Sequence, residues 1–84
     1  MGQKEKLLKR LLTMPRDFEF EEMVSLLGHC GYKLYNNGKM SGSSVRFANE
    51  NGDVIRFHKP HPNNLLKRYI LEGVIEKLKQ GGII

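Results

Sequence analysis

Three histidines, His29, His58 and His61, are the side chains of this 84-residue chain best suited to acid–base chemistry, because an imidazole gains or loses its proton near physiological pH. His29 falls on the polar side of a predicted helix, which is typical of a solvated surface histidine. His61 lies between two prolines, where it either fixes the loop or contacts phosphate. His58 ends a predicted strand that also carries Arg56. It is therefore either a structural strand-end residue or a general acid or base with phosphate-binding cations within reach.

Other reactive groups lack the neighbours that catalysis or metal binding requires. Cys30, the single cysteine, lies on the apolar side of a predicted helix, so we expect it to serve packing. His58 and His61 are three residues apart, but prolines stiffen the segment and no third ligand lies nearby in sequence. We therefore expect no metal site and no cofactor. With one cysteine no disulfide can form within the chain, which favours a reducing, cytoplasmic compartment.

The formal net charge of +5 is concentrated in the middle of the chain. Residues 33–68 hold seven basic side chains and two acidic ones, whereas basic and acidic residues balance in the rest of the sequence. Such a distribution is typical of a protein that binds a polyanion such as RNA, and it also fits a merely solvated basic surface. No apolar run is long enough to span a membrane, so we expect no membrane partner.

The spacing of apolar residues predicts the order helix, helix, strand, strand, strand, helix. Glycine at position 31 is expected to end the second helix, and Asn63 or Asn64 to cap the last one. The predicted ranges are 4–12, 20–30, 32–35, 44–48, 54–58 and 63 or 64 to about 80. This order predicts one α+β domain, in which the long helices cover one face of a three-stranded antiparallel sheet.

The register of the second hairpin follows from its turn. A three-residue loop, Glu50-Asn51-Gly52, with glycine in the left-handed position keeps all four apolar strand residues on one face, whereas a two-residue loop would not. The opposing pairs that this loop predicts are Val45 with Phe57, Phe47 with Ile55, Ser44 with His58, and Arg46 with Arg56. The last two pairs then lie together on the uncovered face of the sheet.

Several segments together resemble the HicA toxin family. They are PRDFEFEEMVSLL, the Gly31-Tyr32 step, the GKMSGSS run, the strand ending in HKPHP, and the closing LKRYILEGVIEKLKQGGII. The resemblance covers nearly the whole chain. It implies a double-stranded-RNA-binding-domain-like fold for a single domain over residues 1–84, with residues 1–15 as an added N-terminal helical extension.

The resemblance also implies a function. Members of the family are small mRNA interferases that a HicB antitoxin holds inactive, so the expected partners are mRNA and a HicB-type antitoxin. The family's second strand usually opens with Gly-Ser-His, whose histidine is catalytic, and here Gly42, Ser43 and Ser44 stand in its place. A third-strand histidine that is also frequent in the family matches His58. Either His58 carries the chemistry or catalysis has been lost.

We therefore expect a toxin that cleaves RNA without a metal, with His58 as acid or base. The side chains expected to hold phosphate or approach the RNA backbone are Lys39, Ser43, Ser44, Arg46, Arg56, Lys59 and His61. The alternative is a non-catalytic module of the same fold that binds RNA or a protein partner.

Overall fold

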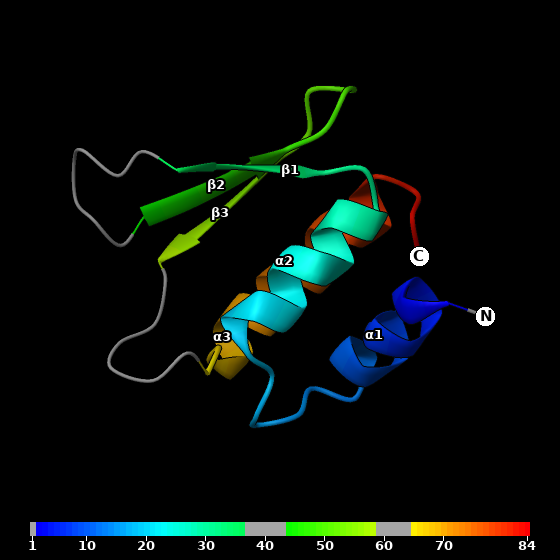
Figure 1. The fold of residues 1–84 in the computed structure, drawn as a ribbon, viewed down its shortest axis with the longest axis vertical. Coiled ribbons are helices and arrows are strands. Elements are labelled where there is room, and N and C mark those ends of the chain that lie inside the picture. Colours follow the sequence, from blue (N-terminus) through cyan, green and yellow to red (C-terminus); the bar gives the residue numbers. More distant parts are fainter. Residues whose placement is uncertain (1, 37–43, 59–64) are drawn as a thin grey trace.

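A computed structural model describes residues 2–36, 44–58 and 65–84, which form three helices and a three-stranded antiparallel sheet (Figure 1). The elements are α1 (Gln3–Leu12), α2 (Phe20–His29), β1 (Lys33–Asn36), β2 (Ser44–Ala48), β3 (Val54–His58) and α3 (Arg68–Gln80). Helices α2 and α3 cover one face of the sheet, and α1 packs against both helices (Figure 1). The predicted α+β class is confirmed, whereas the likeness to double-stranded-RNA-binding domains stays a prediction.

Both ends of α2 are fixed by local hydrogen bonds. At the start, Glu19 and Glu22 form a reciprocal capping box, in which the Glu22 carboxylate accepts the Glu19 backbone N–H at 2.9 Å. At the end, Gly31 adopts a φ of +93°, and the Tyr32 N–H donates to the Leu27 carbonyl at 2.8 Å. This left-handed turn is the one that glycine tolerates without strain. It sends the chain from α2 directly into β1.

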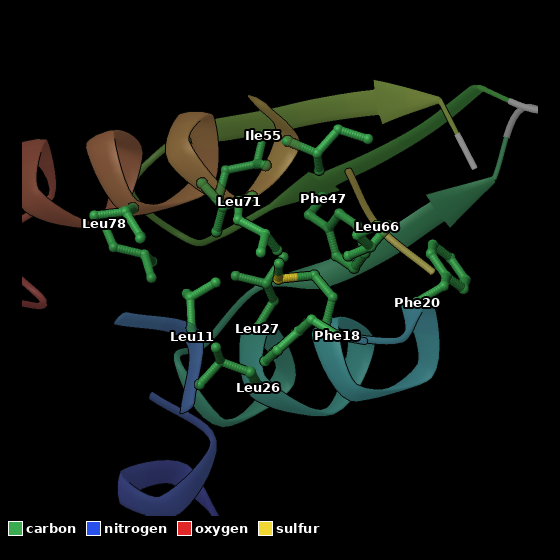
Figure 2. Close-up of a cluster of buried hydrophobic side chains, with 14 of the residues drawn as sticks. Leu11, Phe18, Phe20, Leu26, Leu27, Phe47, Ile55, Leu66, Leu71 and Leu78 are labelled. Atoms are coloured by element: carbon green, nitrogen blue, oxygen red, sulfur yellow. The ribbon is translucent and has the colours of Figure 1, made fainter. Parts of the chain in front are cut away.

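The hydrophobic core lies between the inner face of the sheet and the helices (Figure 2). The apolar side chains that are almost completely buried include Leu11, Phe18, Met23, Leu26, Leu27, Phe47, Ile55, Leu71 and Leu78. Because Leu11 belongs to α1, the first helix is an integral part of this core. The central part of the inner sheet face is thus used for packing, since Val45, Phe47 and Ile55 are all buried there.

The predicted hairpin register is confirmed. Strand β2 lies in the centre of the sheet, and its pairs with β3 include Phe47 with Ile55 and Ser44 with His58. The turn closes as expected for a three-residue loop. The Asn49 N–H donates to the Asp53 carbonyl at 3.1 Å, and Gly52 has a φ of +88°.

The start of the last helix was predicted wrongly. Helix α3 begins at Arg68, preceded by Lys67, rather than after Asn63 or Asn64, which lie outside the described residues. The reason is a long-range contact: Leu65 forms an isolated antiparallel bridge with Glu19, and the Leu66 N–H donates to the Phe18 carbonyl at 2.8 Å. This pairing holds the chain extended until Lys67. The other element boundaries differ from the predicted ones by about one residue.

Candidate functional site

The face of the sheet turned away from α2 and α3 is here called the outer face. Its described residues are Lys33, Tyr35, Ser44, Arg46, Ala48, Val54, Arg56 and His58, which alternate with the inward-facing residues along each strand. Four of them carry or can carry positive charge, and none is acidic. No helix in the described part of the chain is long and apolar enough to cross a membrane.

His58 lies at the end of β3, directly opposite Ser44 on β2. The His58 side chain is exposed and that of Ser44 is half-buried. Within residues 2–36, 44–58 and 65–84, His58 forms no ion pair and no side-chain hydrogen bond. An imidazole in this position is free to exchange protons with a bound molecule, and the Ser44 hydroxyl beside it can position that molecule.

Arg46 and Arg56 oppose each other one row further along the same face. The hydrogen-bonded pair Asn49–Asp53 sets the alternation of the ladder, so Arg46 and Arg56 form a non-hydrogen-bonded pair with Cα atoms about 4.5 Å apart. Neither guanidinium has a carboxylate partner among the described residues. Like charges on directly opposite residues of a sheet are destabilising, and a bound anion would relieve the repulsion.

A groove of about 380 Å³ runs along the open edge of β3, between that strand and α3. His58, Arg56, Tyr69 and Lys77 lie along it, and Gly73 of α3 widens it because it has no side chain. His58 can therefore be reached both from the outer face and from the edge of the sheet. A larger and more open hollow of about 820 Å³ follows α1 beside Lys6, Lys9 and Leu12, but no histidine or cysteine of the described residues lines it. We therefore place the site at the sheet.

The structure brings together four of the predicted site residues: His58, Ser44, Arg46 and Arg56 share the outer face in two adjacent rows. The other four, Lys39, Ser43, Lys59 and His61, lie outside the described residues. No three histidine, cysteine or acidic side chains among the described residues are grouped so that they could hold a metal ion.

Two other candidates lie away from this site. His29 is exposed near the end of α2, in the helical layer rather than on the outer face of the sheet. Cys30 is half-buried at the end of the same helix, and its burial raises the pKa of the thiol. A higher pKa keeps the thiol protonated and unreactive, in agreement with the packing role expected for Cys30.

Sequence reasoning missed Lys33 and Tyr35, which join the same face from β1. Tyr35 lies opposite Arg46, and the Arg46 guanidinium carbon is 5.3 Å from the centre of the Tyr35 ring. The alternation Tyr32-Lys33-Leu34-Tyr35 carries the signal, because Tyr32 is buried in the core and Tyr35, three residues later, must face the other way. The register between β1 and β2 was also needed to put Tyr35 beside Arg46.

The comparison with known families agrees with the resemblance inferred from the sequence. A family model for the HicA toxin of bacterial toxin–antitoxin systems matches residues 20–83. The chain belongs to the HicA toxin family. The matched range begins with α2 and includes all three strands and α3, so the outer face lies within it and α1 does not. No curated protein and no solved structure matches the chain.

Membership of the HicA family makes this chain the toxin of a toxin–antitoxin pair. It also implies that an antitoxin protein is its partner.

Proposed function

We propose that this HicA-family toxin cleaves RNA, with the outer face of the sheet as the substrate-binding surface and His58 as the catalytic residue. The observation that carries the proposal is the position of His58, exposed and opposite Ser44, one row from the facing pair Arg46 and Arg56. This arrangement offers a proton-transfer group beside two cations that lack carboxylate partners among the described residues.

The reaction that suits these groups is attack by the 2′-hydroxyl of the RNA on the adjacent phosphorus. The new bond between the 2′-oxygen and phosphorus closes a cyclic phosphate as the bond to the 5′-oxygen of the next nucleotide breaks. Neutral His58 takes the proton of the 2′-hydroxyl, or its protonated form gives a proton to the departing 5′-oxygen. One such group contributes about 10²- to 10⁴-fold to the rate.

Arg46 and Arg56 stabilise the negative charge that develops on the phosphoryl oxygens, because the sheet register fixes the two residues directly opposite each other before the substrate binds. Lys59 follows His58 directly in the sequence and would add a further cation for binding phosphate. Lys39 and the run that ends in Ser43 precede β2, where small side chains allow the RNA backbone to approach closely. His61 follows two residues after Lys59 in the sequence and would be a further group to contact phosphate. This route needs no metal ion and no cofactor.

The antitoxin would inhibit most directly by covering the same face. We infer a HicB-type partner with acidic groups opposite Arg46 and Arg56, since opposite charges speed association and fix the orientation of two proteins. A complex of this kind buries roughly 1,200–2,000 Å² of surface in total. Both partners would act in the cytoplasm, where mRNA is found.

One observation favours the alternative, a module that binds RNA or protein without cutting it. Acid–base cleavage of RNA uses one group to remove a proton and another to supply one, and no second histidine or carboxylate lies on the described part of the outer face beside His58. A non-catalytic toxin would still use the two arginines to hold phosphates.

The deciding experiment is an RNA-cleavage assay with purified protein in the presence of EDTA. We expect the unmodified toxin to cut RNA and His58→Ala to reduce the rate by about 10²-fold or more. His29→Ala is the matched control, because His29 is exposed on α2 away from the outer face, and it should cut RNA at the unmodified rate.

Two outcomes would count against the proposal. If His58→Ala cuts RNA as fast as the unmodified toxin, His58 is not the catalytic residue and His61 becomes the next candidate. If the unmodified protein binds RNA without cutting it and does not arrest growth when expressed, the non-catalytic alternative is correct.

A further inference from the structure

Tyr35 is a large aromatic side chain that the proposed cleavage reaction does not use and that the core does not need. It lies on β1 with 45% of its surface exposed, on the outer face opposite Arg46. Its neighbour Leu34 faces the opposite side of the sheet and is itself 39% exposed. An exposed tyrosine ring beside cationic side chains is able to stack on a planar group of a ligand.

The side chains around the Tyr35 ring indicate which class of ligand would bind there. The Arg46 guanidinium lies over the ring with 5.3 Å from its central carbon to the ring centre, which holds the Tyr35 side chain in place before anything binds. Arg56 continues the same row on the next strand. A ligand with a flat aromatic surface next to a negative charge matches this row, and every nucleotide combines a planar base with a phosphate.

The distance to His58 also fits a single RNA strand. Tyr35 and His58 are separated by two strand spacings, about 10 Å, and by two residues along the strands, about 7 Å. These two components place their backbones roughly 12 Å apart. A strand of RNA covers that distance within a few nucleotides, so one molecule can reach both side chains.

We propose that Tyr35 and Arg46 form a base-binding subsite, in which an unpaired nucleobase stacks on the Tyr35 ring while Arg46 and Arg56 hold the neighbouring phosphates. The base has to be unpaired and unstacked, because in a duplex both of its faces are covered by adjacent base pairs. This inference rests on the proposed function in one respect only: RNA must bind to the outer face. It does not require that His58 cleaves the RNA.

The test uses RNA probes that cannot be cut, so that binding is measured separately from catalysis. Fluorescence anisotropy would follow the binding of a labelled single strand with methylated 2′-hydroxyls, and of the same strand annealed into a duplex. We expect Tyr35→Val, which keeps a residue that fits a strand, to weaken single-strand binding by about 5- to 150-fold. Tyr35→Phe keeps the ring and should stay within about twofold of the unmodified protein, and Tyr35→Val should leave duplex binding unchanged.

Stacking makes a prediction that a purely structural role for Tyr35 does not. When abasic nucleotides replace the bases of the single strand one at a time, one position should weaken binding to the unmodified protein. The same replacement should have little further effect on Tyr35→Val, because the partner of that base is already missing. Equal unfolding midpoints of the two proteins would show that the substitution has not damaged the fold.

The possible failures are distinguishable. If the unmodified protein binds neither the single strand nor the duplex, the RNA-cleavage proposal fails together with the subsite. If it binds RNA and Tyr35→Val binds equally well, or loses affinity equally for single strand and duplex, the subsite is wrong and the cleavage proposal stands. If Tyr35→Val weakens only the binding of the antitoxin, the ring belongs to a protein-docking surface and the subsite is again wrong.

Discussion

Arg46 and Arg56 lie directly opposite each other on β2 and β3, and no described carboxylate stands between them. Charged residues on an edge strand such as β3 protect the sheet from pairing with other chains. This protection explains a positive charge at Arg56 but not one at Arg46. Arg46 is on the central strand, where no such protection is needed. The contact of Arg46 with Tyr35 orients the guanidinium without neutralising its charge. The facing pair therefore destabilises the sheet locally, and a bound polyanion would remove this destabilisation.

Replacing one of the two arginines should therefore have opposite effects on stability and on binding. We expect Arg56→Gln to raise the free energy of unfolding by about 0.2–1 kcal/mol at low salt, because a like-charge pair is removed. The gain should shrink as salt screens the repulsion. The affinity for single-stranded RNA should fall, and the slope of log K against log salt should become shallower by about 0.7. Urea unfolding and RNA titrations at several salt concentrations measure these changes.

Lys9→Gln provides the control for the loss of one positive charge, since Lys9 is exposed on α1, away from the sheet. Lys9→Gln should show neither the shallower salt slope of RNA binding nor the gain in stability at low salt that we expect for Arg56→Gln. An Arg56→Gln protein that is less stable than the unmodified one at low salt would show that Arg56 makes a favourable contact. If the salt slope of RNA binding is unchanged in Arg56→Gln, Arg56 is not part of the RNA-binding surface.

The part of the site that could be predicted from sequence is the part that a short turn fixes. Three loop residues with glycine in the left-handed position allow only one register between β2 and β3, so the pairing of Ser44 with His58 and of Arg46 with Arg56 follows from residues within 15 positions of each other. Tyr35 is joined to β2 by residues 37–43, whose sequence defines no turn of fixed length. Its place beside Arg46 depends on a register that local sequence does not determine.

The same distinction explains the error at the start of α3. The apolar stripe from Leu66 onward is compatible with a helix, and asparagines just before it are good capping residues. What prevents an earlier start is the pairing of Leu65 and Leu66 with Phe18 and Glu19, nearly 50 residues away in the chain. A contact over that separation leaves no periodic signal in the sequence.

Helix α1, which lies outside the range matched by the family, contributes to the core through Leu11. The Leu11 side chain is completely buried, whereas that of the adjacent Leu12 is 48% exposed. We expect Leu11→Ala to lower the free energy of unfolding by about 2–5 kcal/mol, because it removes buried methyl groups and leaves a cavity against α2 and α3. Chemical denaturation measures the loss.

Leu12→Ala is the matched control, since it makes the same chemical change one residue away. Its effect should stay within about 0.5 kcal/mol, as for most substitutions of exposed residues. Similar, small effects of the two substitutions would mean that α1 is not packed against the remainder of the core in solution.

A charged contact anchors the same helix to α2. The Arg10 guanidinium donates to the Glu22 carboxylate at 2.9 Å and to the Asp17 carboxylate at 3.1 Å, and its carbon lies 5.6 Å from the centre of the Phe18 ring. Burial alone would raise the pKa of Glu22. The hydrogen bonds from Arg10 and from the Glu19 backbone N–H, together with the charge of Arg10, outweigh that effect and hold the pKa below its usual value of 4.5. The folded state therefore favours the ionised carboxyl group.

This pKa shift predicts how the contribution of Arg10 depends on pH. A carboxyl group whose pKa is lower in the folded state adds stability above its unfolded pKa and loses it as the pH falls through the folded one. Arg10→Met should therefore lower the free energy of unfolding by about 1 kcal/mol at pH 7, a modest figure because the ion pair is partly exposed. The difference should narrow as the pH falls below 4.5, the usual value for Glu22.

Carbon-13 NMR of the Glu22 carboxyl group should show that its pKa is higher in Arg10→Met than in the unmodified protein. The reason is that the hydrogen bond and the charge of Arg10 no longer oppose the effect of burial on this pKa. A stability difference that is constant from pH 7 to pH 3 would mean that Arg10 acts through its packing on Phe18 and not through the charge of Glu22.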